Sequence, residues 1–158
     1  MRTFKLIASG LGTGYAPFAP GTAGSILGVF IFYIFHFILN KYNWAVSPVF
    51  ILNLVAIVIV LVLGVWSIKE VHKIWIHDAP EIVIDEIVGV WITLLLIPFQ
   101  WQYYLLGLAV FRFFDIAKPL GIRKLDNQQS DWSVMLDDVL AGVYGFIVMQ
   151  LIIHFITT

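Results

Sequence analysis

The topology of this chain depends on residues 87–111, which read IVGVWITLLLIPFQWQYYLLGLAVF. The stretch has no charged residue and is long enough for the roughly 20 apolar residues that cross a bilayer as one helix. Pro98 lies near its middle, close to Gln100 and Gln102, and proline breaks a regular helix because it lacks an amide hydrogen. We therefore favour two helices that turn at residues 98–102, with a single span as the alternative.

Uncharged stretches also lie on both sides of this segment. Residues 6–40, 42–67 and 139–158 contain no Asp, Glu, Lys or Arg. The whole chain is 61% hydrophobic and only 12% charged, whereas a soluble domain carries about 25% charged residues. A soluble fold of this size would leave too many apolar side chains in water, so lipid is the expected solvent.

These stretches predict an all-α fold, a polytopic membrane bundle that forms one domain over residues 1–158. The expected spans are residues 25–39, residues 48–66, the two helices of a hairpin between residues 81 and 116, and a final helix over residues 137–156. That gives about five membrane helices. The absence of cysteine excludes disulfides and thiolate metal sites.

Basic residues are unevenly distributed in this topology. Lys41, between the first two spans, is the one basic residue on its side of the membrane. The others fall on the opposite side, at Arg2, Lys5, Lys69, Lys73, Arg112, Lys118, Arg123 and Lys124. Because cytoplasmic loops are enriched in Lys and Arg, we expect the polar segments of this multi-pass protein to lie in the cytoplasm.

Six carboxylates lie at the ends of the predicted helices on that same side. They are Asp78, Asp85, Glu86, Asp115, Asp137 and Asp138. So many carboxylates stay ionised together only if cations neutralise them, and Mg²⁺ is the expected cation because it prefers hard oxygen ligands. The predicted metal ligands are the two pairs of adjacent acids, Asp85 with Glu86 and Asp137 with Asp138. Asp78 or Asp115 is the predicted general base or orienting group. The alternative is that acidic residues simply favour helix N-termini.

Two basic residues accompany these acids in FRFFDIAKP, residues 111–119. Arg112 stands three residues before Asp115, a spacing that allows an ion pair on a helix. Arg112 and Lys118 are the predicted phosphate-binding catalytic residues, and simple anchoring at the cytoplasmic surface is the alternative. Thr22 and Ser25 are weaker candidates for phosphate binding, because their Gly- and Pro-rich segment precedes the first predicted helix.

Four segments of the chain resemble the phosphatidylglycerophosphatase A family. They are GYAPFAPGTAGS over residues 14–25, DAPEIVIDEIVG over residues 78–89, FRFFDIAKP over residues 111–119 and VMLDDVLAG over residues 134–142. The segments occur in the order of the family and cover the chain nearly from end to end. Two departures stand out: residues 126–133 read DNQQSDWS where the family typically has a His-Gly-Gly stretch, and the usual K-P-x-P-I reads KPLGI.

The resemblance implies hydrolysis of phosphatidylglycerophosphate to phosphatidylglycerol, with Mg²⁺ required and the six carboxylates as the active-site acids. The expected location is a bacterial-type inner (cytoplasmic) membrane, with interfacial active-site loops that face the cytoplasm. The expected partner is a phospholipid substrate within the bilayer, and no nucleic acid; the oligomeric state stays open. Attack by water and attack by an aspartate both remain possible nucleophilic steps. The rival interpretations are a membrane cation transporter and another Mg²⁺-dependent lipid-phosphate enzyme. Transport would require carboxylates near the bilayer midplane, but every uncharged stretch lacks one.

Overall fold

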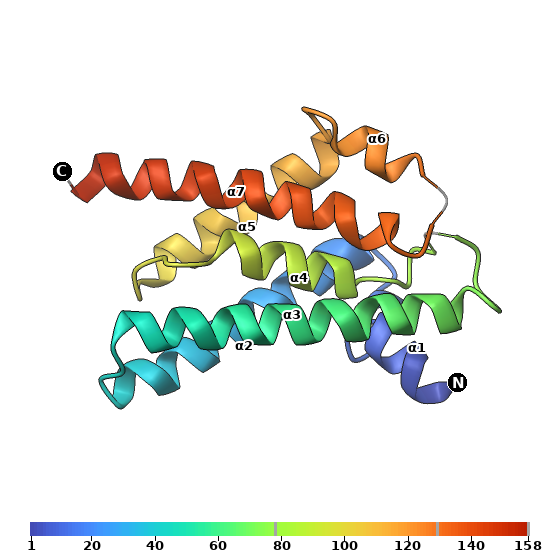
Figure 1. Ribbon diagram of the computed structural model, residues 1–158, viewed down its shortest axis with the longest axis horizontal. Coiled ribbons are helices and arrows are strands. Elements are labelled where there is room, and N and C mark those ends of the chain that lie inside the picture. Colours follow the sequence, from blue (N-terminus) through green and yellow to red (C-terminus); the bar gives the residue numbers. More distant parts are fainter. Residues whose placement is uncertain (78, 129, 158) are drawn as a thin grey trace.

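The computed structural model describes residues 1–77, 79–128 and 130–157, and within these residues it contains helices and no strand (Figure 1). The predicted all-α class is therefore confirmed. The helices are α1 (Arg2–Ala8), α2 (Pro20–Lys41), α3 (Val46–Val71), α4 (Ile84–Thr93), α5 (Trp101–Ala117), α6 (Ile122–Asp126) and α7 (Ser133–Thr157), with a 3₁₀ turn at Thr13–Tyr15.

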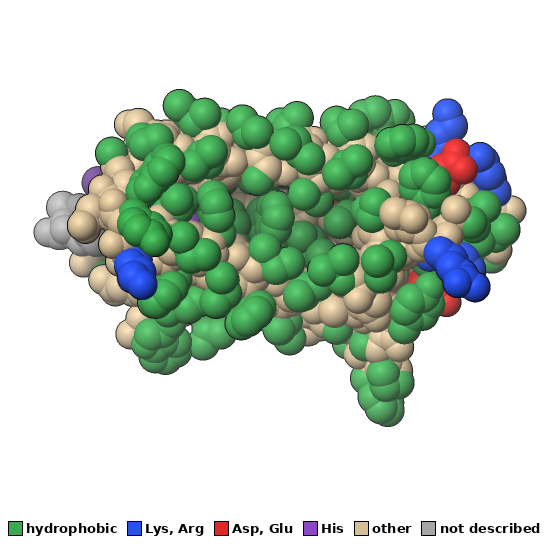
Figure 2. Space-filling view, turned by 90° about the horizontal axis from the view of Figure 1, so that it is seen from below, with side chains coloured by type: hydrophobic (Ala, Val, Ile, Leu, Met, Phe, Trp, Pro, Cys, Tyr) green, Lys and Arg blue, Asp and Glu red, His purple; other side chains and the backbone are tan. Residues whose placement is uncertain are grey.

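Three of these helices are long and apolar enough to cross a membrane within the described part of the chain. They are α2, α3 and α7, which have 22, 26 and 25 residues. The expected count of about five is only approximate, because α4 and α5 are shorter, at 10 and 17 residues. Figure 2 shows hydrophobic side chains along the flank of the bundle, with charged side chains gathered mainly at one end. This distribution suits a bundle that lies across a bilayer.

The segment between α4 and α5 turns back, as the two-helix interpretation predicts. After Thr93 the chain leaves the helix, and Leu94, Leu95 and Ile97 are buried against the other helices. Gln150 of α7 donates a hydrogen bond from Nε2 to the Leu95 carbonyl at 3.0 Å. Non-helical backbone at membrane depth requires such internal partners, because lipid supplies none. The turn therefore brings the start of α4 and the end of α5 to the same end of the bundle (Figure 1).

Several boundaries differ from the expected ones. Helix α2 begins at Pro20 instead of residue 25, because proline is favourable in the first turn of a helix, where its missing amide hydrogen has no partner to lose. Helix α7 begins at Ser133 instead of residue 137. The short helices α1 and α6 were not expected, since neither contains an apolar run of membrane length.

Small residues let α4 and α7 cross at close range. A Cβ atom on Gly142 of α7 would lie 2.5 Å from the Gly89 carbonyl oxygen of α4, and one on Gly145 would lie 2.5 Å from Thr93 Oγ1. The Thr93 hydroxyl donates to the Gly89 carbonyl at 3.2 Å and lies 3.3 Å from the Gly142 carbonyl. Close packing of small residues and hydrogen bonds between helices are the usual means of joining membrane helices. This crossing fixes the start of α4 beside the start of α7.

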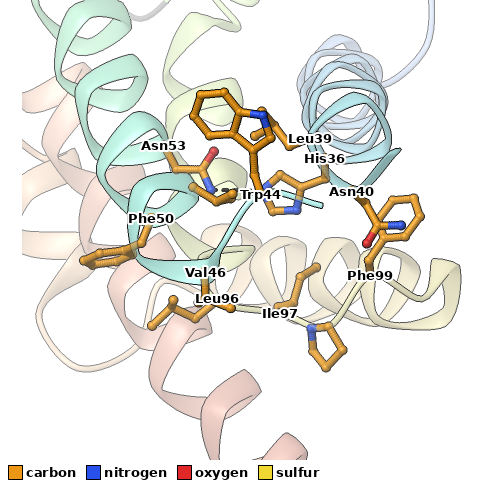
Figure 3. Close-up of a pocket in the computed structure, with 12 residues that line it drawn as sticks. His36, Leu39, Asn40, Trp44, Val46, Phe50, Asn53, Leu96, Ile97 and Phe99 are labelled. Carbon is orange, nitrogen blue, oxygen red and sulfur yellow. Dashed lines mark hydrogen bonds between the residues drawn. The ribbon is translucent and has the colours of Figure 1, made fainter. Parts of the chain in front are cut away.

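Polar side chains join α2, α3 and α5 near the opposite end of the bundle. Asn53 Nδ2 lies 2.9 Å from His36 Nε2, and His36 Nδ1 lies 2.9 Å from the Tyr104 hydroxyl. All three side chains are buried, and Figure 3 shows the Asn53 and His36 pair beside a cavity of about 310 Å³. Because removing one partner would leave a buried polar group unsatisfied, we expect each member to contribute about 1–3 kcal/mol to stability.

Candidate active site

A polar cavity of about 450 Å³ opens at the end of the bundle that carries most of the charge. Its walls come from the start of α2, the start of α4, the end of α5 and the start of α7. The predicted site residues that line it are Asp85, Glu86, Arg112, Asp115, Lys118, Asp137 and Asp138. Residues far apart in sequence thus meet at one place, with five carboxylates facing two cationic side chains.

The other predicted site residues are placed differently. Asp78 lies outside the described residues. Thr22 and Ser25 are not among the residues that line the cavity, and the buried Ser25 hydroxyl donates to the Gly21 carbonyl at 2.8 Å. The start of α2 instead faces the site through Ala19, Pro20 and Gly21.

Gly21 allows α2 to approach the acidic residues closely. A Cβ atom at this position would lie 2.1 Å from Glu86 Oε1 and 3.3 Å from Arg112 Nη1. No larger residue fits there without moving one of the two side chains. The signal in the sequence was the Gly- and Pro-rich segment itself, although it pointed to the neighbouring hydroxyls instead of to this glycine.

Three carboxylates at the centre of the cavity are close enough together to hold one cation. Asp85, Glu86 and Asp138 each present an oxygen, and these oxygens lie within 4.8 Å of one another. Asp85 and Asp138 are only 6% and 3% exposed. Glu86 Oε2 is buried and has no hydrogen-bond partner among the described residues. A set of buried carboxylate oxygens with an unsatisfied member fits a hard divalent cation, which would relieve both the repulsion and the desolvation.

Arg112 lies between the acidic residues of α4 and α5. Its Nη1 atom is 2.5 Å from Asp115 Oδ2 and 3.9 Å from Glu86 Oε1, and all three side chains are largely buried. The predicted pairing of Arg112 with Asp115 one turn later is therefore present. The carboxylate of Asp115 holds the guanidinium in place at the cavity wall, where it can meet an anionic ligand.

Lys118 lies on the other side of the cavity, just beyond α5. Its Nζ atom donates to Asp137 Oδ2 at 2.7 Å and also to Asp126 Oδ1. Burial acts to lower the pKa of Lys118, but the hydrogen bonds and charges of Asp126 and Asp137 outweigh it and raise this pKa above the ordinary lysine value. Lys118 is therefore a permanent cation at neutral pH, directed at the same cavity.

The contact between Lys118 and Asp126 was not predicted from the sequence. Asp126 ends α6, at the start of the loop that departs from the family pattern, and it accepts a hydrogen bond from Lys118, which also donates to Asp137. A second contact of the same loop joins Asp131 Oδ1 to His72 Nδ1 by a hydrogen bond of 2.6 Å. Nothing in the spacing of these residues indicated either partner, because both contacts depend on how the loop folds against the bundle.

Three helices begin at this cavity. Pro20 and Gly21 open α2, Asp85 lies in the first turn of α4, and Asp137 lies in the second turn of α7. The N-terminal end of a helix carries about half a positive charge from its aligned peptide dipoles. These ends offset part of the repulsion among the carboxylates and favour an anionic ligand such as a phosphate.

Comparison with known proteins assigns the chain to a family. The family model described as "Phosphatidylglycerophosphatase A" matches residues 6–153. No protein of known structure matches the chain.

Three curated relatives match over most of their length. A protein of Bacteroides thetaiotaomicron named "Putative phosphatidylinositol-3-phosphatase" is 42% identical, over 91% of this chain and 89% of its own. The proteins named phosphatidylglycerophosphatase A of Escherichia coli and Haemophilus influenzae are 34% and 37% identical. Those matches cover 96% and 94% of this chain, and 84% and 88% of the relatives.

Proposed function

Because the chain belongs to the phosphatidylglycerophosphatase A family, we propose that it hydrolyses phosphatidylglycerophosphate to phosphatidylglycerol and inorganic phosphate. Enzymes of this kind are phosphoric monoester hydrolases. One observation carries the proposal: Asp85, Glu86 and Asp138 meet Arg112 and Lys118 in one cavity at the end of a membrane bundle. A cavity with carboxylates for a cation and two cationic side chains for an anion suits a phosphate ester whose lipid part stays in the bilayer.

The proposed cofactor is Mg²⁺, held by Asp85, Glu86 and Asp138, with Asp137 beside them. The close approach of the three oxygens and the unsatisfied Glu86 Oε2 support this assignment. When bound, Mg²⁺ supplies positive charge to the phosphate oxygens and so favours attack on phosphorus. Mg²⁺ commonly uses one or two protein carboxylates together with oxygens of the substrate phosphate. The four acids here supply more carboxylates than that.

The remaining residues have proposed roles in binding and in proton transfer. Arg112, held by Asp115, would bind two phosphate oxygens with its planar fork, and Lys118 would bind a third as a point charge. Both would stabilise charge that develops on the phosphoryl oxygens during displacement. Asp78 or Asp115 would accept the proton of the attacking water.

The proposed site faces the cytoplasm. Lys41 lies in the last turn of α2, at the end of the bundle opposite the carboxylates (Figure 1). The other eight Lys and Arg residues of the chain lie in or beside the helix ends and loops at the carboxylate end. An excess of basic residues at one end is typical of the cytoplasmic side of a membrane protein.

Two other functions compete with this proposal. A cation transporter would need acidic residues along a path through the bundle, but the acidic residues that line the cavity lie at one end of it. A phosphatase for phosphatidylinositol 3-phosphate is the closer rival, because the Bacteroides relative bears that name and is 42% identical. Both substrates are phosphate monoesters on a lipid, so the distinction requires a direct comparison of the two.

The decisive experiment measures phosphate release by the purified protein in detergent micelles. Phosphatidylglycerophosphate and phosphatidylinositol 3-phosphate are compared, each with Mg²⁺ and with a chelator. We expect Mg²⁺-dependent release, faster with phosphatidylglycerophosphate, and a loss of about 10²-fold or more in Asp85→Asn and Asp138→Asn. These two variants test whether the two acidic pairs, which are far apart in the sequence, act at one site.

Glu70→Gln is the matched control, because Glu70 lies at the same end of the bundle and, among the described residues, forms its ion pair with the exposed Lys73 and does not line the cavity. Its activity is expected to equal that of the natural protein. Faster release from phosphatidylinositol 3-phosphate would move the substrate assignment to the rival. No release from either lipid by the folded protein would refute the phosphatase proposal.

A further inference from the structure

A groove between α2 and α5 runs along the outside of the bundle toward the bilayer. It has a volume of about 430 Å³ and is lined by apolar and aromatic side chains. Ile26, Phe30 and Tyr33 form its α2 wall, and Trp101, Leu105 and Leu108 form its α5 wall. Several of these are exposed, including Phe30 at 61% and Leu105 at 54%. Lipid chains can therefore reach the groove from the side.

The groove begins close to the polar cavity on both helices. At the cavity itself α2 and α5 are neighbours, since a Cβ atom on Gly21 would lie 3.3 Å from Arg112 Nη1. Ile26 follows Gly21 by five residues, and Leu108 precedes Arg112 by four, a separation of about 6–8 Å along each helix axis. The groove thus continues from the cavity within about two turns of helix.

One face of α5 contributes both to the polar cavity and to the groove. Leu108 and Arg112 are separated by four residues and so lie above one another on the helix. A second shallow groove, on the α7 side of α5, is lined by Ala109, Val110 and Phe113, which belong to a different face. A lipid whose phosphate is held by Arg112 would therefore lay its chain along the α2 side.

The cavity and the groove together match one leaflet of a bilayer in length. From Gly21 at the cavity to Tyr33 at the far end, α2 rises through about 18 Å. Half of the hydrocarbon core of a bilayer is about 15 Å thick. The groove has a volume of about 430 Å³, which is too small for another helix and suits a single hydrocarbon chain.

We propose that the α2–α5 groove binds one acyl chain of the lipid whose phosphate occupies the polar cavity. This inference rests on the proposed function and adds to it a subsite for the hydrophobic part of the substrate. The groove would hold the phosphate ester at a fixed depth in the bilayer, where the phosphate lies beside Arg112 and the carboxylates. Chain length then becomes a determinant of affinity.

The test fills the groove with a larger side chain and compares substrates that have long and short acyl chains. Leu105→Trp places a bulky ring at its centre, and Leu151→Trp is the matched control, because Leu151 on α7 is 53% exposed but lies outside the groove. KM and kcat are measured with dipalmitoyl and dihexanoyl phosphatidylglycerophosphate. We expect Leu105→Trp to raise KM for the long-chain lipid about tenfold, as if about two methylene groups were excluded, with KM for the short-chain lipid unchanged. Equal effects on both lipids, or the same shift in Leu151→Trp, would overturn the proposal.

A second measurement reads lipid binding without turnover. Phosphatidylglycerol with a photoreactive diazirine in the middle of one acyl chain is irradiated with the protein, and labelled peptides are identified by mass spectrometry. We expect labelling on α2 and α5 around Phe30 and Leu105, reduced in Leu105→Trp and retained in Leu151→Trp. Labelling spread evenly over α3 and α7 would overturn the groove even if the enzyme is active. Specific labelling with no phosphate release would instead refute the proposed reaction and leave the groove standing.

Discussion

Lys118 shows how single residues tune this site. It has a positive φ of 44°, in the left-handed region that non-glycine residues seldom adopt, and this conformation ends α5. The end of the helix there lets its side chain turn back to Asp126 and Asp137. A lysine paired with two carboxylates cannot act as a proton donor near neutral pH, so its chemistry is that of a fixed charge.

The raised pKa of Lys118 leads to a prediction about pH. A pKa raised in the folded state means that the contribution of the charge to stability is complete below the ordinary lysine value of about 10.4 and is lost as the pH rises from there through the raised value. We therefore expect kcat/KM to show no fall between pH 7 and about 10 that is due to Lys118. Lys118→Met should lower kcat/KM by about 10²-fold at every pH, and Lys118→Arg should restore part of it. An alkaline fall that disappears in Lys118→Arg would contradict this assignment.

At the scale of elements, the site depends on the crossing of α4 and α7. Helix α4 carries Asp85 and Glu86, and helix α7 carries Asp137 and Asp138. Their close contact at Gly89 and Gly142 sets the distance between the two acidic pairs. The geometry of the carboxylates is therefore determined about one helical turn away, inside the bundle.

Gly142→Leu should disturb this crossing. The new side chain would overlap the Gly89 backbone, where even a Cβ atom lies at 2.5 Å, and overpacking of this kind costs about 1–3 kcal/mol. We expect a lower melting temperature in detergent and weaker activation by Mg²⁺, because the acidic pairs move apart. Val143→Leu is the control, since the neighbouring Val143 is 38% exposed. A Gly142→Leu protein with normal stability and normal Mg²⁺ dependence would show that the crossing does not set the site.

The elements also show what sequence alone can predict. Uncharged stretches located α2, α3 and α7, and Pro98 with its two glutamines located the turn before α5, because these features follow from the demands of lipid on any chain. The convergence of Asp85, Glu86, Asp115, Asp137 and Asp138 followed from that turn. The pairing of Lys118 with Asp126, the approach of Gly21 to Glu86 and the contact of His36 with Asn53 did not, because they depend on packing details that no periodicity encodes.

At the scale of the whole molecule, the bundle has two unlike ends. One carries the acidic cavity and most of the basic residues, and the other carries Lys41 and the uncharged contacts of His36, Asn53 and Tyr104. The groove along α2 and α5 leads from the first end toward the second. Under the proposed function, the water-soluble and lipid-soluble parts of the substrate would bind at separate places on one small protein.

The orientation of the bundle can be tested directly, because the chain has no cysteine. Single variants Lys41→Cys and Lys124→Cys place one thiol at each end of the molecule. We expect a membrane-impermeant maleimide, added outside intact spheroplasts, to label Lys41→Cys at once and Lys124→Cys only after the membrane is permeabilised. Labelling in the reverse order would place the carboxylates outside the cytoplasm.

The unequal lengths of the helices affect the surrounding bilayer. Helix α3, with 26 residues, rises through about 39 Å, whereas the lipid-exposed α5, with 17 residues, rises through about 26 Å. A hydrocarbon core of about 30 Å is thicker than α5 is long and thinner than α3 is long, so we expect the bilayer to thin beside α5 and α3 to tilt within it. This hydrophobic mismatch draws headgroups inward at the helix that carries Arg112. Membrane thickness thereby becomes a physical variable that governs how easily a lipid reaches this protein, independently of how much of that lipid the membrane contains.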